Sequence, residues 1–469
     1  MIWDLGKYKN NIALISENEC IDYGSLKACS EKICQNIRER VLVFLLCSNT
    51  YESVAGYIGF LNHGIVPVMI DSSLDMELLS KLLDIYRPKY IWMPVNMSGK
   101  FSNYERSGSL GSYVLLKTGE RLSFPLYDEL ALLMTTSGST GSPKLVRLSY
   151  KNIKANTESI IKYLKIDRNE RSITNLPMHY VYGLSIINTH LYAGASVVMT
   201  EKSMFQKEFW QIVREQEVTN FGGVPYTFEM LNRLRFFKMD LPALKTITQA
   251  GGKLSPALHR KFAEYASQKG KKFVVMYGAA EATARMGYLP PEESLRKCGA
   301  MGLPIPGGRF SLVDEEGRDI EVPHTMGELI YHGDNVMLGY AERGEDLAKG
   351  DEEQGSLHTG DLAEFDEDGY YTILGRKKRF LKIYGKRINL QEVEFILQKR
   401  FNTLGIAVSG RDDQMNVFLE GDIPAEEVKG YIADKFKIHH LALKICCVDS
   451  IPKNSSGKVL YSKLEAMLQ

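Results

Sequence analysis

A segment rich in glycine and hydroxyl groups runs from Thr135 to Lys144, with the sequence Thr-Thr-Ser-Gly-Ser-Thr-Gly-Ser-Pro-Lys. Glycines let a backbone approach an anion closely, and the hydroxyls and the lysine add donors and charge. The segment follows an apolar run at 131–134, so we expect it at a strand end, where ligands bind in α/β sheets. Its spacing is neither that of a Walker A loop nor that of a serine-hydrolase elbow. An anion-binding loop is favoured over a flexible linker, because linkers seldom carry Pro-Lys directly before a strand.

Further short sequences follow this loop in a fixed order. They are Leu176–Leu184, Ala250-Gly251-Gly252, Tyr277-Gly278-Ala279-Ala280-Glu281, Gly327–Tyr340, His358-Thr359-Gly360-Asp361, Gly375–Ile388 and Pro452–Lys458. Each is a weak signal alone, but the ordered series spans about residues 130–460. With the loop, the series resembles the adenylate-forming superfamily, which includes acyl-CoA synthetases, aryl-CoA ligases, luciferases and the adenylation domains of peptide synthetases.

The resemblance implies ATP and Mg²⁺ as ligands and assigns a role to each matching residue. Tyr277 would lie near the adenine, Glu281 would bind Mg²⁺, and Asp361 would bind the ribose with Arg376 nearby. Lys458 would be catalytic, because a cation between carboxylate and α-phosphate lowers the barrier where two anions approach. The implied ATP-binding residues are Thr136, Ser137, Gly138, Ser139, Thr140, Gly141, Lys144, Gly252, Tyr277, Gly278, Glu281, Asp361 and Arg376.

The acid and the thiol have their own implied residues. His179, Tyr180 and Gly251 would line the acid pocket. The C-terminal part would turn about a hinge near Lys378, and Lys382 and Gly385 would follow on the thiol side. The implied hinge and thiolation residues are therefore Lys378, Lys382 and Gly385.

Without the resemblance, the same residues have plainer interpretations. A lone lysine such as Lys458 is usually a solvated charge, and Tyr277 would be a core residue. Asp361 would be a turn residue or a helix cap. His179 alone is more often a buried structural histidine than a functional one. The ordered series makes the functional interpretation the better one for Lys458, Asp361 and His179.

The sequence also departs from the family pattern. The threonine expected before Glu281 is Ala280, which removes one donor to the nucleotide, and the neighbouring Thr283 offers another hydroxyl. An arginine expected after the C-terminal lysine is Tyr461. The amino-acid-activating branch carries an aspartate where this chain has Tyr180, and a buried ammonium without a counter-ion is costly. We therefore expect a fatty, aryl or other uncharged acid.

Composition narrows the class of protein. The chain has 469 residues, a formal net charge of +1 and seven cysteines. The length predicts at least two domains, and the charge gives no indication of nucleic-acid binding. No cysteine pair has CxxC spacing, which favours reduced thiols and a cytoplasmic protein. The N-terminus does not resemble a signal peptide, and no apolar run near it is long enough to span a bilayer, so we expect no integral membrane contact.

The elements that must position these residues can be predicted coarsely. Residues 31–39 look helical, whereas 41–45, 66–70 and 273–276 look like strands, and this alternation predicts a mostly parallel sheet. After about residue 305, short strands with acidic, glycine-ended turns predict antiparallel hairpins. Asn389 and Glu392 resemble the start of a helix.

The resemblance implies an α/β fold with two domains. A large N-terminal domain, residues 1–377, would hold two α/β subdomains and a β-barrel-like part, and residues 378–469 would form a small mobile α+β domain. The implied reaction activates a carboxylic acid with ATP and passes the acyl group to a thiol, most readily that of coenzyme A. Two alternatives stay open: loading of a separate carrier protein through its phosphopantetheine, and a non-catalytic homologue that binds nucleotide or acid.

Overall fold

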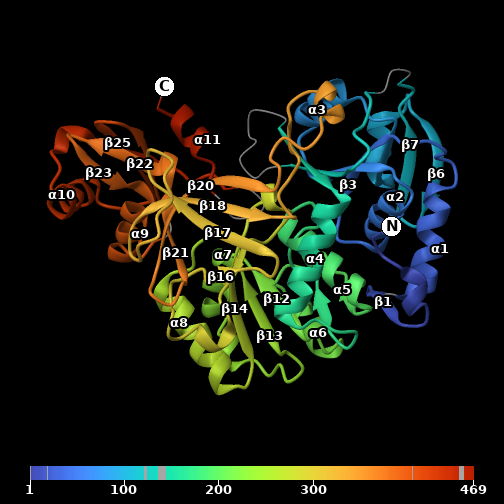
Figure 1. Cartoon of the computed structure of the whole chain (residues 1–469), viewed down its shortest axis with the longest axis horizontal. Helices are drawn as coiled ribbons and strands as arrows, with labels where there is room; N and C mark the ends of the chain where they lie inside the picture. Colours follow the sequence, from blue (N-terminus) through green and yellow to red (C-terminus); the bar gives the residue numbers. More distant parts are fainter. Residues whose placement is uncertain are drawn as a thin grey trace. The chain divides into compact units, whose positions relative to one another are not determined.

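The computed structural model describes residues 2–17, 19–120, 124–135, 144–403, 405–453 and 459–468 (Figure 1). The chain divides into two compact units. The first comprises Met1–Phe310 and Tyr331–Leu357, and the second comprises Ser311–Ile330 and His358–Gln469. The boundary expected at residues 377 and 378 stays a prediction, because compactness does not locate a hinge.

The first unit holds an eight-stranded sheet that carries the predicted anion loop. Its inner strands β8, β4, β3 and β5 are parallel, and antiparallel strands flank them. All six residues of β3 are buried, as expected of a strand covered on both faces. The sheet order is β19 (Gly339–Ala341), β9 (Leu145–Ser149), β8 (Leu130–Thr135), β4 (Val66–Asp71), β3 (Leu42–Cys47), β5 (Tyr90–Pro94), β7 (Tyr113–Lys117) and β6 (Glu105–Leu110).

A nine-stranded sheet forms the other half of this unit. The run from β14 to β1 is parallel, and antiparallel strands close both ends. Its order is β16 (Leu303–Pro304), β15 (Gly287–Tyr288), β14 (Lys272–Tyr277), β13 (Thr246–Gln249), β12 (Asn220–Gly223), β10 (Arg171–Ile173), β11 (Ser196–Val198), β1 (Ile12–Ile15) and β2 (Cys20–Asp22). These two sheets confirm the mostly parallel α/β architecture expected from the sequence.

Helices cover the sheets of the first unit, and α4 and α5 lie side by side between the two halves of this unit (Figure 1). Several begin at polar caps: Ser149 and Asn152 form a capping box at α4, and Asp75 caps α3. The helices are α1 (Tyr23–Cys34), α2 (Tyr51–Asn62), α3 (Met76–Tyr86), α4 (Tyr150–Leu164), α5 (Val181–Ala193), α6 (Lys207–Glu215), α7 (Pro225–Arg233) and α8 (Pro256–Gln268).

The helix expected over residues 31–39 is wrong in its bounds. The structure places α1 at Tyr23–Cys34, so only the first part of the expected range is helical. Arg40 donates to the backbone carbonyls of Gly64, Tyr127 and Leu130. These bonds hold the chain at the start of β3, so the polar stretch before Arg40 serves as a connection instead of a last helical turn.

The second unit contains the antiparallel hairpins that the sequence predicts. Strands β20 (Ser356–Phe365) and β21 (Tyr371–Arg376) pair across the turn Asp366–Gly369. They belong to an open four-stranded sheet of order β17 (Gly308–Val313), β18 (Gly327–Gly333), β20 and β21, which stands where the barrel-like part was expected.

The C-terminal residues of the second unit form an α+β arrangement with its own core, centred on residues such as Val393, Val417 and Ile432. Asn389 caps α9 by accepting from two backbone N–H groups, as predicted. The elements are β22 (Phe380–Ile383), β23 (Lys386–Asn389), α9 (Leu390–Arg400), β24 (Ile406–Arg411), β25 (Gln414–Glu420), α10 (Ala425–Phe436), β26 (Leu443–Val448) and α11 (Tyr461–Ala466). Among the helices in the described ranges, none combines the length and the apolar character that crossing a membrane requires.

Candidate nucleotide and acid site

Two side chains predicted to bind the phosphates and their Mg²⁺, Lys144 and Glu281, are joined by a third, Tyr340, in the first unit. The ammonium of Lys144 lies 3.5 Å from the centre of the Tyr340 ring, a cation–π contact. The Tyr340 hydroxyl donates a 2.9 Å hydrogen bond to Glu281 Oε1. One tyrosine therefore joins the lysine of the predicted anion loop to the predicted Mg²⁺ ligand, although they are 137 residues apart in the chain, the difference between positions 281 and 144.

Strand pairing places Tyr340 beside the loop lysine. Residues 339–341 form β19, which pairs with β9 so that Tyr340 lies opposite Val146, two residues after Lys144. The backbone N–H of Met337 also donates to the carbonyl of Glu281 at 2.8 Å. The segment 337–341 is thus bonded both to the strand after the loop and to the turn that carries Glu281.

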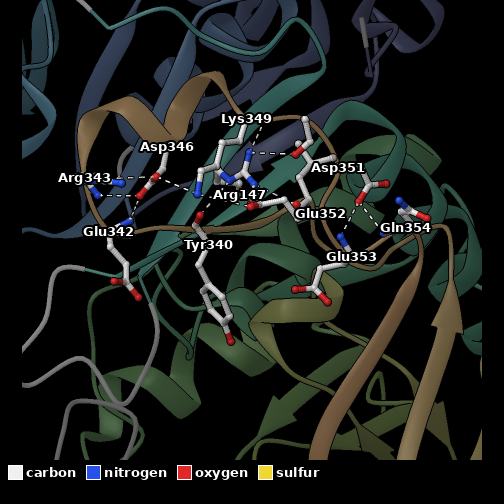
Figure 2. Close-up of polar contacts among 12 residues, drawn as sticks. Arg147, Tyr340, Glu342, Arg343, Asp346, Lys349, Asp351, Glu352, Glu353 and Gln354 are labelled. Carbon is white, nitrogen blue, oxygen red and sulfur yellow. Dashed lines mark hydrogen bonds and ion pairs between the residues drawn. The ribbon is translucent and has the colours of Figure 1, made fainter.

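Arg147, which the sequence analysis did not identify, binds the backbone of this segment. Its fully buried guanidinium donates to the carbonyls of Leu338, Tyr340, Lys349 and Gly350, and it pairs with Glu352 (Figure 2). The Tyr340 ring points away from these contacts (Figure 2). Burial lowers the pKa of Arg147 and Glu352 raises it. A charged residue inside the apolar sequence of β9 was the signal that predicts such a buried role.

Other predicted residues of the phosphate site lie outside the described residues. These are the loop residues Thr136, Ser137, Gly138, Ser139, Thr140 and Gly141, and the catalytic candidate Lys458. Their assignments stay predictions. The structure does show that the loop connects the end of β8 to the start of β9, because Thr135 ends one strand and Leu145 starts the other.

The predicted adenine-side residues Tyr277 and Gly278 lie at the end of β14. Tyr277 is the last residue of the strand, and its ring lies 6.4 Å from that of Phe310, centre to centre. Position 278 requires glycine because the backbone of Ala284 passes close to it. A side-chain carbon at position 278 would lie 1.8 Å from the carbonyl oxygen of Ala284. The chain folds back on Gly278 and brings Glu281 to the end of the sheet.

Thr283 does not replace the hydroxyl that Ala280 lacks. Its Oγ1 donates to the carbonyl of Asn335 at 2.8 Å, and the residue is buried. Thr283 has φ of 64°, a left-handed conformation that is unusual for a β-branched residue. The Thr283 hydroxyl therefore stabilises the turn by its bond to Asn335 and does not donate to the nucleotide.

The predicted pocket residues come together at the start of α5. A side-chain carbon on Gly251, whose φ is +84°, would lie 2.5 Å from the Tyr180 hydroxyl, so Gly251 and Tyr180 are in direct contact. Gly252 lies against the ring of Pro225. His179 Nε2 lies 3.5 Å from Asp71 at the end of β4. Burial lowers the pKa of His179 and Asp71 opposes it, which favours a neutral imidazole.

The second unit carries the residues predicted for the ribose and the thiol. Asp361 and Arg376 face each other across β20 and β21, with Arg376 Nε 2.8 Å from Asp361 Oδ1. The aspartate is buried, whereas the arginine side chain is half exposed. The Asp361 backbone N–H donates to Thr359 Oγ1, and Arg376 donates to the Thr359 carbonyl. This arrangement presents a fixed carboxylate, the acceptor that two ribose hydroxyls require.

The predicted hinge and thiol-side residues lie on one exposed stretch of this unit. Lys378 is in a single 3₁₀ turn, Lys377–Arg379, directly before β22. Lys382 is exposed on β22, and Gly385 occupies the tip of the β22–β23 hairpin with φ of +81°. Apart from its two neighbours in the chain, no described residue lies within 4 Å of the place where a Gly385 side chain would start. The tip is therefore open to a ligand.

The donor set in the first unit suits a magnesium ion held chiefly by a nucleotide. Within the described ranges, no three His, Cys, Asp or Glu side chains gather as a protein-only metal cage. Mg²⁺ commonly binds through one or two carboxylates together with phosphates and waters. The carboxylate of Glu281, oriented by Tyr340 and near Lys144, fits that pattern.

Comparisons with known proteins agree with these assignments of fold. Oxalate–CoA ligase of Arabidopsis thaliana is 28% identical over 346 residues, which are 71% of this chain and 66% of that protein, so the chain matches slightly under two thirds of that relative. The 2-succinylbenzoate–CoA ligase of Bacillus subtilis is 26% identical over 97% of this chain and 94% of its own.

Solved structures show the same fold. The o-succinylbenzoate CoA synthetase of Bacillus subtilis, in complex with an acyl-adenylate, covers 98% of this chain and 97% of its own with a TM-score of 0.79 and 22% identity. The same enzyme with ATP and magnesium has a TM-score of 0.79 and 23% identity over 98% of each chain. ATP-bound MatB of Rhodopseudomonas palustris has a TM-score of 0.79 and 20% identity, over 99% of this chain and 98% of its own.

The family itself is settled by the match of a whole-domain model. The model described as AMP-binding enzyme matches residues 3–341, which include the phosphate loop, the pocket segment, Glu281 and Tyr340. The resemblance inferred from the ordered short sequences is thereby confirmed, and its expected class, an AMP-forming acid–thiol ligase, agrees with the names of the relatives. The chain belongs to the AMP-binding enzyme family.

Proposed function

We propose that this protein activates a carboxylic acid with ATP, forms an acyl-adenylate and pyrophosphate, and then transfers the acyl group to the thiol of coenzyme A. The observation that supports the proposal is the Lys144–Tyr340–Glu281 group, because it joins a cation and a carboxylate, which are the groups that nucleotide phosphates and their Mg²⁺ require. The relatives named as CoA ligases support coenzyme A as the acceptor.

Each residue acts by position and charge, as suits transfer of a nucleotidyl group. Lys144 attracts the β- and γ-phosphates, and Glu281 supplies one ligand to Mg²⁺, which when bound neutralises phosphate charge. Asp361 accepts from the ribose hydroxyls, with Arg376 fixing its orientation. The Lys458 ammonium stabilises the approach of the carboxylate to the α-phosphorus, where two anions would otherwise repel each other.

The second half-reaction requires a different arrangement, because the thiol must reach the carbon that Lys458 faces in the first. We propose that the C-terminal residues turn about Lys378, which brings the hairpin tip at Gly385 to serve the thiol. The 3₁₀ turn at Lys377–Arg379 and the exposed hairpin support this assignment. We also place the protein in the cytoplasm, since all seven cysteines are free thiols.

Pyrophosphate release tests the proposal. The full chain would be assayed with ATP, Mg²⁺ and a panel of carboxylic acids, first without an acceptor and then with coenzyme A or a holo-carrier protein. We expect pyrophosphate with at least one acid, and thioester formation with coenzyme A. Thioester on the carrier alone would replace the acceptor in the proposal, whereas no pyrophosphate with any acid, despite ATP binding, would contradict it.

A further inference from the structure

Arg285 is buried in the first unit with few of its donors used. The residue is 3% exposed, its Nη1 donates to the carbonyl of the adjacent Ala284, and its Nε has no hydrogen-bond partner among the described residues. The guanidinium carbon lies 4.0 Å from the centre of the Tyr182 ring. A guanidinium has five N–H donors in a planar fork, so this side chain retains capacity for an anion.

Arg147 shows what a structural arginine looks like in this protein. It is equally buried, but it donates to four backbone carbonyls and pairs with Glu352. Within the described parts of the chain, no carboxylate pairs with Arg285. Because an unpaired buried charge is costly, its retention indicates a partner that arrives from outside.

Arg285 lines a cavity that adjoins the predicted acid pocket. Helix α5 contributes Tyr182, Ser185 and Ile186 to this cavity, β13 contributes Thr248, and β14 contributes Met276. Met276 directly precedes Tyr277, and Tyr182 follows Tyr180 by two residues. Two of these elements adjoin the predicted pocket walls, because Tyr180 directly precedes α5 and Gly251 follows the end of β13 by two residues.

The groups around this cavity supply no counter-charge to Arg285. Burial raises the pKa of Tyr182 to about 12 and also raises the pKa of Tyr163, so both hydroxyls are neutral near neutral pH. His190, another lining residue, has its pKa lowered by burial to about 4 and is also neutral. The lining carboxylate is that of Glu170, near the amino ends of the strands, where it pairs with Lys245 and accepts from Thr219.

We propose that the acid activated by this enzyme carries a second carboxylate, which Arg285 binds while the first carboxylate reacts with ATP. The inference rests on the proposed function and replaces the sequence-based expectation of an uncharged acid. Nε and one terminal nitrogen of Arg285 present parallel donors that match the two oxygens of a carboxylate. The Tyr182 ring keeps the guanidinium plane in place for that contact.

Matched acids test the proposal on the full chain. Initial rates of pyrophosphate release would be compared within the pairs butanoate and butanedioate, hexanoate and hexanedioate, and benzoate and benzene-1,2-dicarboxylate. At least one diacid should exceed its monoacid in kcat/KM by about a hundredfold, the scale of a charge-assisted pair in a buried site. Arg285→Gln should remove most of that preference, and Arg285→Lys should retain part of it.

Control measurements separate this role from a structural one. Ile186→Val enlarges the same cavity without changing charge, so it should alter a diacid and its monoacid by similar factors. The KM for ATP and the thermal midpoint of each variant report whether the site and fold are intact. Should Arg285→Gln not fold, the diacid preference of the wild type and its partial retention in Arg285→Lys still decide the matter.

Two results would overturn the inference in distinguishable ways. Equal kcat/KM values for each monoacid and its matched diacid would refute the binding of a second carboxylate and leave the proposed function in place. Equal losses of kcat/KM for both acids in Arg285→Gln would have the same consequence. Pyrophosphate release with none of the acids would refute the proposed function, and the inference with it.

Discussion

Removing only the hydroxyl of Tyr340 isolates its bond to Glu281. The variant Tyr340→Phe keeps the ring under the Lys144 ammonium, 3.5 Å away, but loses the 2.9 Å hydrogen bond to the carboxylate. A hydrogen bond to a charged group contributes about 1.5–3 kcal/mol, and the partial exposure of both residues places the expected loss near the lower value. A loss of about 1.5 kcal/mol corresponds to roughly a tenfold change.

The assay is the rate of acyl-adenylate formation as Mg²⁺ is varied at saturating ATP. We expect the half-saturating Mg²⁺ concentration to rise about tenfold in Tyr340→Phe, because a less oriented Glu281 binds the ion more weakly. Tyr340→Leu removes the ring as well and should also raise the KM for ATP, since Lys144 loses its support.

A double-mutant cycle makes this reasoning refutable. If Tyr340 acts through Glu281, the hydroxyl has nothing to orient once the carboxylate is gone, so Tyr340→Phe should have little further effect in a Glu281→Gln background. Fully additive losses, or an unchanged Mg²⁺ dependence in Tyr340→Phe, would show that the hydrogen bond has no part in metal binding.

Four further predictions concern other parts of the protein. Arg147→Met should lower the free energy of unfolding by about 3 kcal/mol in urea titrations, because several buried carbonyls lose their donor; a change below about 0.5 kcal/mol would contradict the buried network. Asp361→Asn should raise the KM for ATP and reduce the enzyme's discrimination against 2′-deoxy-ATP, measured by competing the two nucleotides. Lys458→Ala should abolish adenylate formation but largely spare thioester formation from synthetic acyl-adenylate, and equal losses in both half-reactions would make the lysine structural. Burial lowers the pKa of His190 and His259 to about 4 from an ordinary value of 6.5, so the unfolded state binds more protons between these values. Stability measured in urea should therefore fall as pH drops from 6.5 towards 4, by on the order of 2 kcal/mol per histidine.

The strands were the part of the fold that the sequence predicted best. The ranges 41–45, 66–70 and 273–276 all lie mostly within observed strands, because a buried parallel strand is a continuous apolar run that few other elements produce. The helix at 31–39 was misplaced because its end depends on Arg40, whose carbonyl partners lie as far away as residue 130. Long-range contacts of that kind leave no local periodicity.

The site was predicted as a set of residues but not as a connected structure. Lys144 and Glu281 were assigned from separate short sequences, and Tyr340 was named only as the last residue of a third, with no role of its own. Its joining role depends on the pairing of β19 with β9, which sequence spacing does not reveal. Arg147 and Arg285 were missed altogether, although each stands as a single charge among apolar neighbours, a pattern that predicts a buried partner or ligand.

Oxygen-18 transfer tests the central claim most directly. The protein would be incubated with ATP, Mg²⁺, coenzyme A and a carboxylic acid whose carboxyl oxygens carry oxygen-18, and the products would be measured by mass spectrometry. Attack of the carboxylate on the α-phosphorus predicts one labelled oxygen in AMP, unlabelled pyrophosphate and an acyl thioester. Unlabelled AMP, or ADP with labelled phosphate, would contradict the formation of an acyl-adenylate.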